Sequence, residues 1–110
     1  MEKRIGKIQK ATFGEGGYQE CCIGVSFVLG SDKESWGVHD FWGGWSIKRS
    51  DRAKWTEEER IKELGEMCLR LDDTMKRAKV RFVHELQGTP VEVTFDGNTL
   101  KEWRVLEEVI

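Results

Sequence analysis

The chain has 110 residues, which is room for one hydrophobic core, so we expect a single domain spanning residues 1–110. Hydrophobic residues make up 38% and charged residues 35%, and this apolar content excludes a disordered chain. The formal net charge of −2 excludes the general basic field that holds duplex nucleic acid by counterion release. The sequence has no stretch of about 18 apolar residues and no signal-peptide core, so we expect no membrane partner.

The first half of the chain predicts strands. Residues 4–13 mix apolar and basic side chains in the manner of an edge or half-exposed strand, closed by a glycine-rich turn at 14–17. Apolar residues alternate with small ones over 23–29, which predicts a second strand paired with the first in a hairpin. Residues 35–40 are a third candidate. We interpret residues 41–45, three aromatics around two glycines, as part of a loop with unusually large apolar surface.

One long helix is predicted after residue 55. Thr56 and Glu59 form a capping box, in which the hydroxyl accepts the backbone N–H three residues later. Apolar residues then recur at spacings of three and four, at Ile61, Leu64, Cys68, Leu71, Met75 and Ala78. This narrow seam fits packing on the sheet or helix pairing across a dimer. On either interpretation we expect the Cys68 thiol to be buried.

The C-terminal third predicts a second hairpin. Residues 80–86 read as a bend and one short helical turn, and residues 91–95 alternate apolar with polar side chains. A tight turn at 96–98 leads to a partner strand over 100–109. The fold class is therefore α+β: a small antiparallel sheet built from an N-terminal hairpin or three-stranded meander, one long helix and the C-terminal hairpin.

The sequence contains no recognisable catalytic constellation. Neither His39 nor His84 lies in a nucleophile motif, and the runs of carboxylates are typical of solvated faces. Three cysteines and two histidines lack the spacing of a metal site. We therefore expect a binding protein and not an enzyme, with no cofactor and no metal.

Aromatic residues and arginines are the more informative group. Nucleobases stack on aromatic rings, and guanidinium groups grip phosphates in a bidentate fork. Both halves of such a pocket are present: Tyr18, Phe41, Trp42, Trp45 and Trp103 on one side, and Arg49, Arg52 and Arg104 on the other. The alternative is that the aromatics form the core and the cations lie on the surface.

Four sequence blocks carry a resemblance to a known family. They are IGKI at 5–8, FGEGGYQE at 13–20, KWTEEER at 54–60 and VEVTFDGNTLKEWRVL at 91–106. Through them the chain is similar to small phage-encoded proteins, in particular to the type I Thoeris anti-defence proteins. Members of that group are compact oligomers that capture cyclic ADP-ribose-type signals, and sometimes cyclic oligonucleotides, without cleaving them.

The resemblance implies a phage protein that sequesters an immune signal, such as glycocyclic ADP-ribose or a cyclic oligonucleotide, in the host cytoplasm. It also implies a homodimer or a higher homo-oligomer. A different possibility is a protein that inhibits a host defence nuclease or complex through an exposed patch of Trp42 and Trp45.

We expect the ligand where the C-terminal hairpin meets the segment before the helix. Arg104 and Arg52 would hold phosphates, and Phe41, Trp42 or Trp45 would contact a base. Asn98 and Tyr18 complete the expected set of ligand-binding residues. The competing interpretation of Arg104 is a cross-strand ion pair with Glu92 across the hairpin turn.

Overall fold

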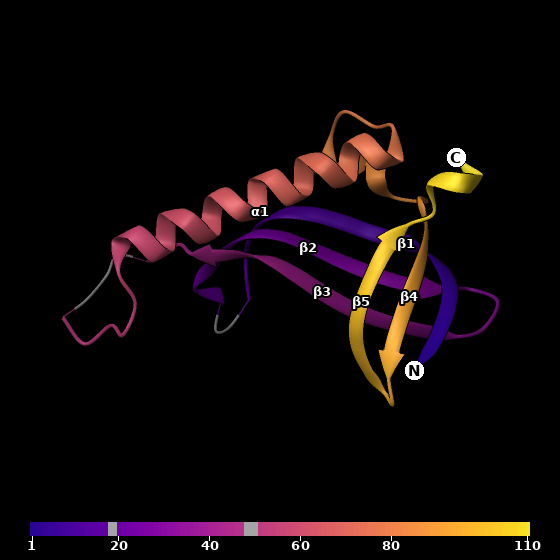
Figure 1. Cartoon of the computed structure of the whole chain (residues 1–110), viewed down its shortest axis with the longest axis horizontal. Helices are drawn as coiled ribbons and strands as arrows, with labels where there is room; N and C mark the ends of the chain where they lie inside the picture. The colour runs from indigo at the N-terminus through magenta and orange to yellow at the C-terminus, as the bar shows by residue number, and fades with distance from the viewer. Residues whose placement is uncertain (18–19, 48–50) are drawn as a thin grey trace.

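A computed structural model describes residues 1–17, 20–47 and 51–110. It confirms the α+β class: a five-stranded antiparallel sheet carries one long helix (Figure 1). In chain order the elements are β1 (Glu2–Gly16), β2 (Cys22–Ser31), β3 (Trp36–Trp45), α1 (Glu57–Ala78), η2 (Val83–Leu86), β4 (Pro90–Asp96), β5 (Thr99–Val105) and η3 (Glu107–Val109). None of the helices in these ranges combines the length and apolar content needed to span a bilayer.

Strand β1 lies at the centre of the sheet, in the order β3-β2-β1-β4-β5. Its C-terminal part pairs with β2 and its N-terminal part with β4, and Lys7 has a partner in both ladders. Of the two predicted alternatives, the edge strand is therefore wrong and the half-exposed strand is confirmed. The mixed polar pattern of β1 arises because one face of this central strand is exposed. A shift of register between Ile8 and Lys10 marks a bulge, and bulges bend strands.

The sheet curls until its two edges approach each other. Strand β3 lies at one edge and β5 at the other, yet the Trp42 and Trp103 rings stack with their centroids 5.3 Å apart. The chain forms a three-stranded meander, then a helix, then a hairpin whose first strand returns to pair with β1. This connectivity is that of OB folds, which are five-stranded, partly open barrels.

The inner face of the sheet and α1 enclose the core. Its fully buried side chains include Ile8, Phe27 and Leu29 from the meander and Val91 and Val93 from β4. Helix α1 covers this face with Met67, Leu71, Thr74 and Ala78, and Leu64 and Met75 pack at the margin. The helix thus packs on the sheet.

Two members of the predicted helix seam point elsewhere. Ile61 is 65% exposed, and Cys68 is exposed, so the prediction of a buried Cys68 thiol was wrong. An α-helix has 3.6 residues per turn, so the side chains that face the sheet lie on the same side of α1 as Met67 and Leu71. Residues 61 and 68 lie to the side of that face.

Strand ends differ from the predictions in two places. Residues 41–45 belong to β3 and not to a loop, because Trp42 packs into the core while its neighbours alternate outward. Strand β5 ends at Val105, and the chain turns into η3 instead of continuing as a strand to residue 109. The start of the helix is confirmed: Thr56 Oγ1 accepts a hydrogen bond from the Glu59 amide at 3.1 Å.

Candidate functional site

An aromatic cluster joins the two edges of the sheet. The indoles of Trp42 and Trp103 are nearly parallel, with an interplanar angle of 14°, and Phe27 packs against both at 4.6 and 4.9 Å. Both indole N–H groups donate to the same carboxylate oxygen, Oδ2 of Asp40, at 2.9 Å from Trp42 and 2.7 Å from Trp103. The Phe41 amide donates to the other oxygen. The two indoles are therefore held in fixed positions.

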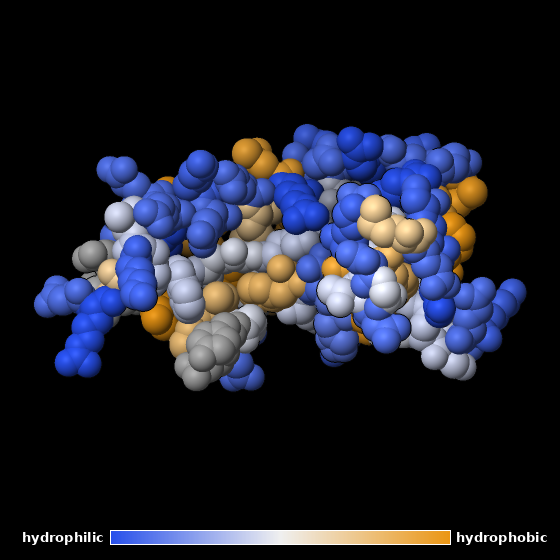
Figure 2. Space-filling view, turned by 60° about the horizontal axis from the view of Figure 1, so that its bottom comes forward, coloured by the Kyte–Doolittle hydropathy of each residue, from blue (hydrophilic) through white to orange (hydrophobic). Residues whose placement is uncertain are grey.

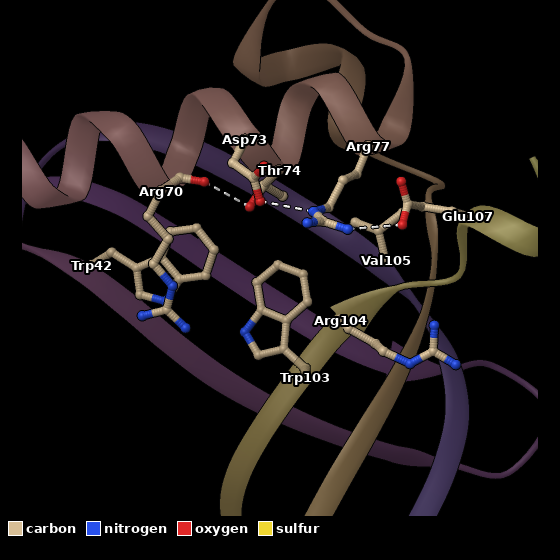
Figure 3. A pocket seen from close by; sticks show the side chains of 9 residues that line it. All are labelled: Trp42, Arg70, Asp73, Thr74, Arg77, Trp103, Arg104, Val105 and Glu107. Carbon is tan, nitrogen blue, oxygen red and sulfur yellow. Dashed lines mark hydrogen bonds and ion pairs between the residues drawn. The ribbon is translucent and has the colours of Figure 1, made fainter.

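A groove opens beside this cluster, between α1 and β5 (Figure 3). It encloses a cavity of about 230 Å³. Tryptophans, arginines and carboxylates line most of it: Trp42, Arg70, Asp73, Thr74, Arg77, Trp103, Arg104, Val105 and Glu107. A second hollow of about 280 Å³ adjoins it along β3 and shares Trp42 and Arg70 with it. The two hollows form one surface that runs along the open side of the barrel.

Two of the groove's arginines are neutralised by neighbouring carboxylates. Arg77 donates to Asp73 at 2.8 Å and to Glu107 at 2.9 Å, and these hydrogen bonds raise the pKa of Arg77. Arg104 donates to Glu108 at 3.1 Å and to Glu92 at 3.3 Å, which raises the pKa of Arg104 in the same way. Each of these two guanidinium groups therefore donates hydrogen bonds to two carboxylates.

Arg70 differs from both. Its guanidinium carbon lies 4.0 Å from the centroid of the Trp42 ring, a cation–π contact (Figure 3). Among the residues that the structure describes, no carboxylate forms an ion pair with Arg70. A guanidinium fixed by stacking and left with free donors is suited to bind an anion.

The structure separates the residues that the sequence grouped together. Trp42 and Arg104 both line the groove, but the Arg104 side chain points away from Trp103 toward its carboxylate partners. Phe41 lines the adjoining hollow. The register pairs Arg104 directly with Glu92, so the cross-strand ion pair is present in the protein.

Other expected ligand residues lie elsewhere. Trp45 stacks on Trp55, with ring centroids 5.8 Å apart. Arg52 is exposed before α1 and lines neither hollow. Asn98 lies at the tip of the β4–β5 hairpin, beside a different hollow near Trp36. Tyr18 and Arg49 fall outside the described residues.

Sequence reasoning missed Arg70 and Arg77. Both lie on a charged face of a long helix, where arginine is ordinary, and no spacing sets them apart from Arg60 or Lys76. Only the approach of β5 to the helix brings them beside Trp103. The sequence also suggested an exposed patch of Trp42 and Trp45. The structure does not contain it, because Trp42 is only 8% exposed.

Comparisons with known proteins add no relative: no family model matches the chain, and no curated protein or solved structure shows significant similarity to it. The likeness to OB folds rests on strand order and connectivity alone, and a fold by itself does not define a function.

Proposed function

We propose that this protein binds a compact, phosphate-containing nucleotide ligand in the groove and does not cleave it. The observation that carries the proposal is the Arg70 guanidinium, which is stacked on Trp42 and has no carboxylate partner in the described part of the chain. Phosphate oxygens match the fork geometry of a guanidinium. Beside it, Trp103 offers a half-buried aromatic ring on which a base can stack.

The groove's other polar groups favour binding over reaction. The Thr74 hydroxyl donates to the backbone oxygen of Arg70 at 2.8 Å, and the carboxylates of Asp73 and Glu107 both accept from Arg77. A nucleophile needs an adjacent general base. The Thr74 hydroxyl gives its proton to a backbone oxygen and not to a carboxylate, so these groups form no nucleophile–base pair.

Within this class, the ligand we propose is a cyclic ADP-ribose-type or cyclic oligonucleotide immune signal, held by a phage anti-defence protein in the host cytoplasm. The support is the sequence resemblance together with the compact groove. Ligand pockets usually measure about 300–1,000 Å³. Since the groove of one chain encloses about 230 Å³, we propose that a second copy completes the site.

The test compares two arginine variants. Affinities are measured by isothermal titration against glycocyclic ADP-ribose and a panel of cyclic di- and trinucleotides. We expect Arg70→Met to weaken binding at least about tenfold, because hydrogen bonds to a charged group contribute about 1.5–3 kcal/mol. Methionine preserves the apolar stem over Trp42 and removes only the fork.

Arg104→Met is the matched control, since the Arg104 donors already serve Glu92 and Glu108. Its affinity should stay within about twofold of the parent protein. Bound ligand is then released by heat and must be recovered intact. A protein that binds none of these compounds, or loses equal affinity in both variants, contradicts the proposal.

A further inference from the structure

The second hollow, which adjoins the groove along β3, has a chemistry of its own. Glu63, Glu66 and Arg70 of α1 border it on one side, and residues 41–43 of β3 border it on the other. The helix comes close to the strand here because Gly44 has no side chain: a Cβ atom on Gly44 would lie 3.3 Å from the Cβ of Glu63. The Glu63 side chain therefore starts directly beside β3.

The strand side of the second hollow is an open edge, because β3 is the last strand of the sheet. The Phe41 amide donates to Asp40, and the Trp45 carbonyl accepts a hydrogen bond from Arg60 at 2.8 Å. Every second residue of β3, counted from these two, thus directs its backbone groups away from β2. Gly43 lies between them in an unbroken register. Its N–H and C=O groups point to the open edge, where no strand of the described chain pairs with them.

The helix side of the second hollow carries both signs of charge. Arg70 is stacked on Trp42 and suits a phosphate, as argued above. Glu63 forms no ion pair in the described ranges, whereas the Glu66 carboxylate lies 3.9 Å from the Lys62 ammonium. A carboxylate accepts hydrogen bonds, donates none and repels phosphate. A ligand that fills this hollow must therefore bring N–H donors to Glu63 and its phosphate to Arg70.

The two sides of the hollow also differ in polarity. Gly43 has no side chain, so β3 offers a low wall of backbone opposite the charged groups of α1. Figure 2 shows the same contrast across the molecule: a band of near-neutral and hydrophobic surface lies below the hydrophilic helix. A flat ring with polar groups along one edge matches such a boundary.

We infer that the second hollow selects guanine, with Glu63 accepting from the N1–H and N2–H groups of the base and the Gly43 amide donating to O6. The inference rests on the proposed function and narrows it to a guanine nucleotide. Among the four RNA bases, only guanine presents two adjacent N–H donors beside an acceptor on its Watson–Crick edge. Adenine and cytosine place an unprotonated ring nitrogen, and uracil places carbonyl oxygens, where the carboxylate needs donors.

Arg70 connects this subsite with the groove, because it lines both hollows. A phosphate held by Arg70 can join a guanine in the second hollow to a base stacked on Trp103. A cyclic dinucleotide contains all three parts.

The test uses three ligands that differ only in their bases: cyclic di-GMP, cyclic di-IMP and cyclic di-AMP. Hypoxanthine lacks the N2 amino group of guanine, and adenine lacks the N1–H donor as well. In isothermal titration we expect the protein to bind cyclic di-GMP at least about tenfold more tightly than cyclic di-AMP, with cyclic di-IMP between them. The reason is the loss of hydrogen bonds to a charged acceptor. This comparison needs no variant.

Three variants assign the preference to a side chain. Glu63→Gln replaces one acceptor oxygen by a donor group. It should weaken cyclic di-GMP binding at least about tenfold and leave cyclic di-AMP binding within about twofold. Glu66→Gln is the matched control: it makes the same change in the same hollow, at a carboxylate that lies near a lysine, and should alter neither affinity by more than about twofold. Arg70→Met should weaken both ligands by the same factor, because the phosphate is common to them.

Equal affinities for cyclic di-GMP and cyclic di-AMP overturn the inference, and so does a guanine preference that survives Glu63→Gln. Binding of glycocyclic ADP-ribose without any binding of cyclic di-GMP overturns it as well. In each of these cases, binding that depends on Arg70 leaves the proposed function standing. If the protein binds none of the cyclic compounds, the proposed function fails and the inference fails with it.

Discussion

Asp40 shows how one side chain sets the geometry of the aromatic cluster. A single oxygen accepts hydrogen bonds from two indoles that belong to opposite edges of the sheet. Hydrogen bonds to a charged acceptor are shorter and stronger than neutral ones. The carboxylate therefore links β3 to β5 at a point where no backbone ladder does so.

Removing that carboxylate should destabilise the fold. In Asp40→Ala the N–H groups of Trp42 and Trp103 lose their acceptor, and an unsatisfied buried donor costs about 1–3 kcal/mol. We expect the free energy of unfolding, measured by urea titration, to fall by about 2–4 kcal/mol. Asp40→Asn keeps one acceptor oxygen and should lose less. Equal midpoints for the parent protein and Asp40→Ala would mean that the two indoles are held by packing alone.

Arg104 and Arg70 differ in whether neighbouring carboxylates engage their donors. The sequence predicted that Arg104 would hold a phosphate, and in the structure its guanidinium donates to Glu92 and Glu108. Its side chain is 52% exposed, and ion pairs of this kind contribute little to stability. Arg70 differs, since its guanidinium is stacked on Trp42 and forms no ion pair among the described residues.

Among the elements, β2 and β3 depend on glycine for their close approach. Gly24 pairs with Gly43, and a Cβ on Gly24 would lie 2.7 Å from the Gly43 Cα as well as colliding with the Trp42 carbonyl. Backbone atoms inside a ladder cannot move aside as a flexible side chain does. These two strands therefore tolerate no side chain at position 24.

A pair of alanine substitutions tests this requirement. Gly24→Ala should lower the free energy of unfolding by about 1–3 kcal/mol, the usual cost of forcing extra volume into a packed site. Gly14 lies in the same row, but a Cβ there meets nothing within 4 Å. Gly14→Ala should therefore change stability by no more than about 0.5 kcal/mol. Urea titrations of both variants provide the measurement, and similar losses in the two would rule out the backbone collision as the cause.

At the scale of the whole molecule, one chain leaves apolar surface uncovered. Ile61 and Leu69, both on α1, are 65% and 72% exposed, although the opposite face of that helix is buried on the sheet. Contiguous apolar patches are typical of interfaces, and these two side chains are our candidates for the contact with a second copy. It agrees with the proposal that a second copy completes the small groove.

We therefore expect a homodimer or a higher homo-oligomer in solution. Static light scattering at tens of micromolar should give at least twice the mass of one chain. Leu69→Glu should shift the mass toward the monomer, because it places a charge in the apolar contact, while Lys79→Glu, at the exposed end of the helix, should not. A single-chain mass for the parent protein would argue against both the oligomer and the shared site.

Much of the local structure could be predicted from the sequence. The capping box at Thr56, the helical spacing and the turn at residues 96–98 specify their elements through contacts between residues close in the chain. The α+β class follows from the order of those elements. Alternation of apolar residues also located most of the strands, since its period of two is a local property.

The arrangement of the strands and the position of a site could not be predicted in this way. The central place of β1, the inclusion of residues 41–45 in β3 and the approach of Trp103 to Trp42 all depend on pairings between distant segments. A pattern along the chain shows that one face of a strand is apolar, but it does not show which strand will lie beside it. For the same physical reason, Arg70 acquires its significance only when the curled sheet brings Trp42 beneath it and leaves its guanidinium without a carboxylate partner in the described residues.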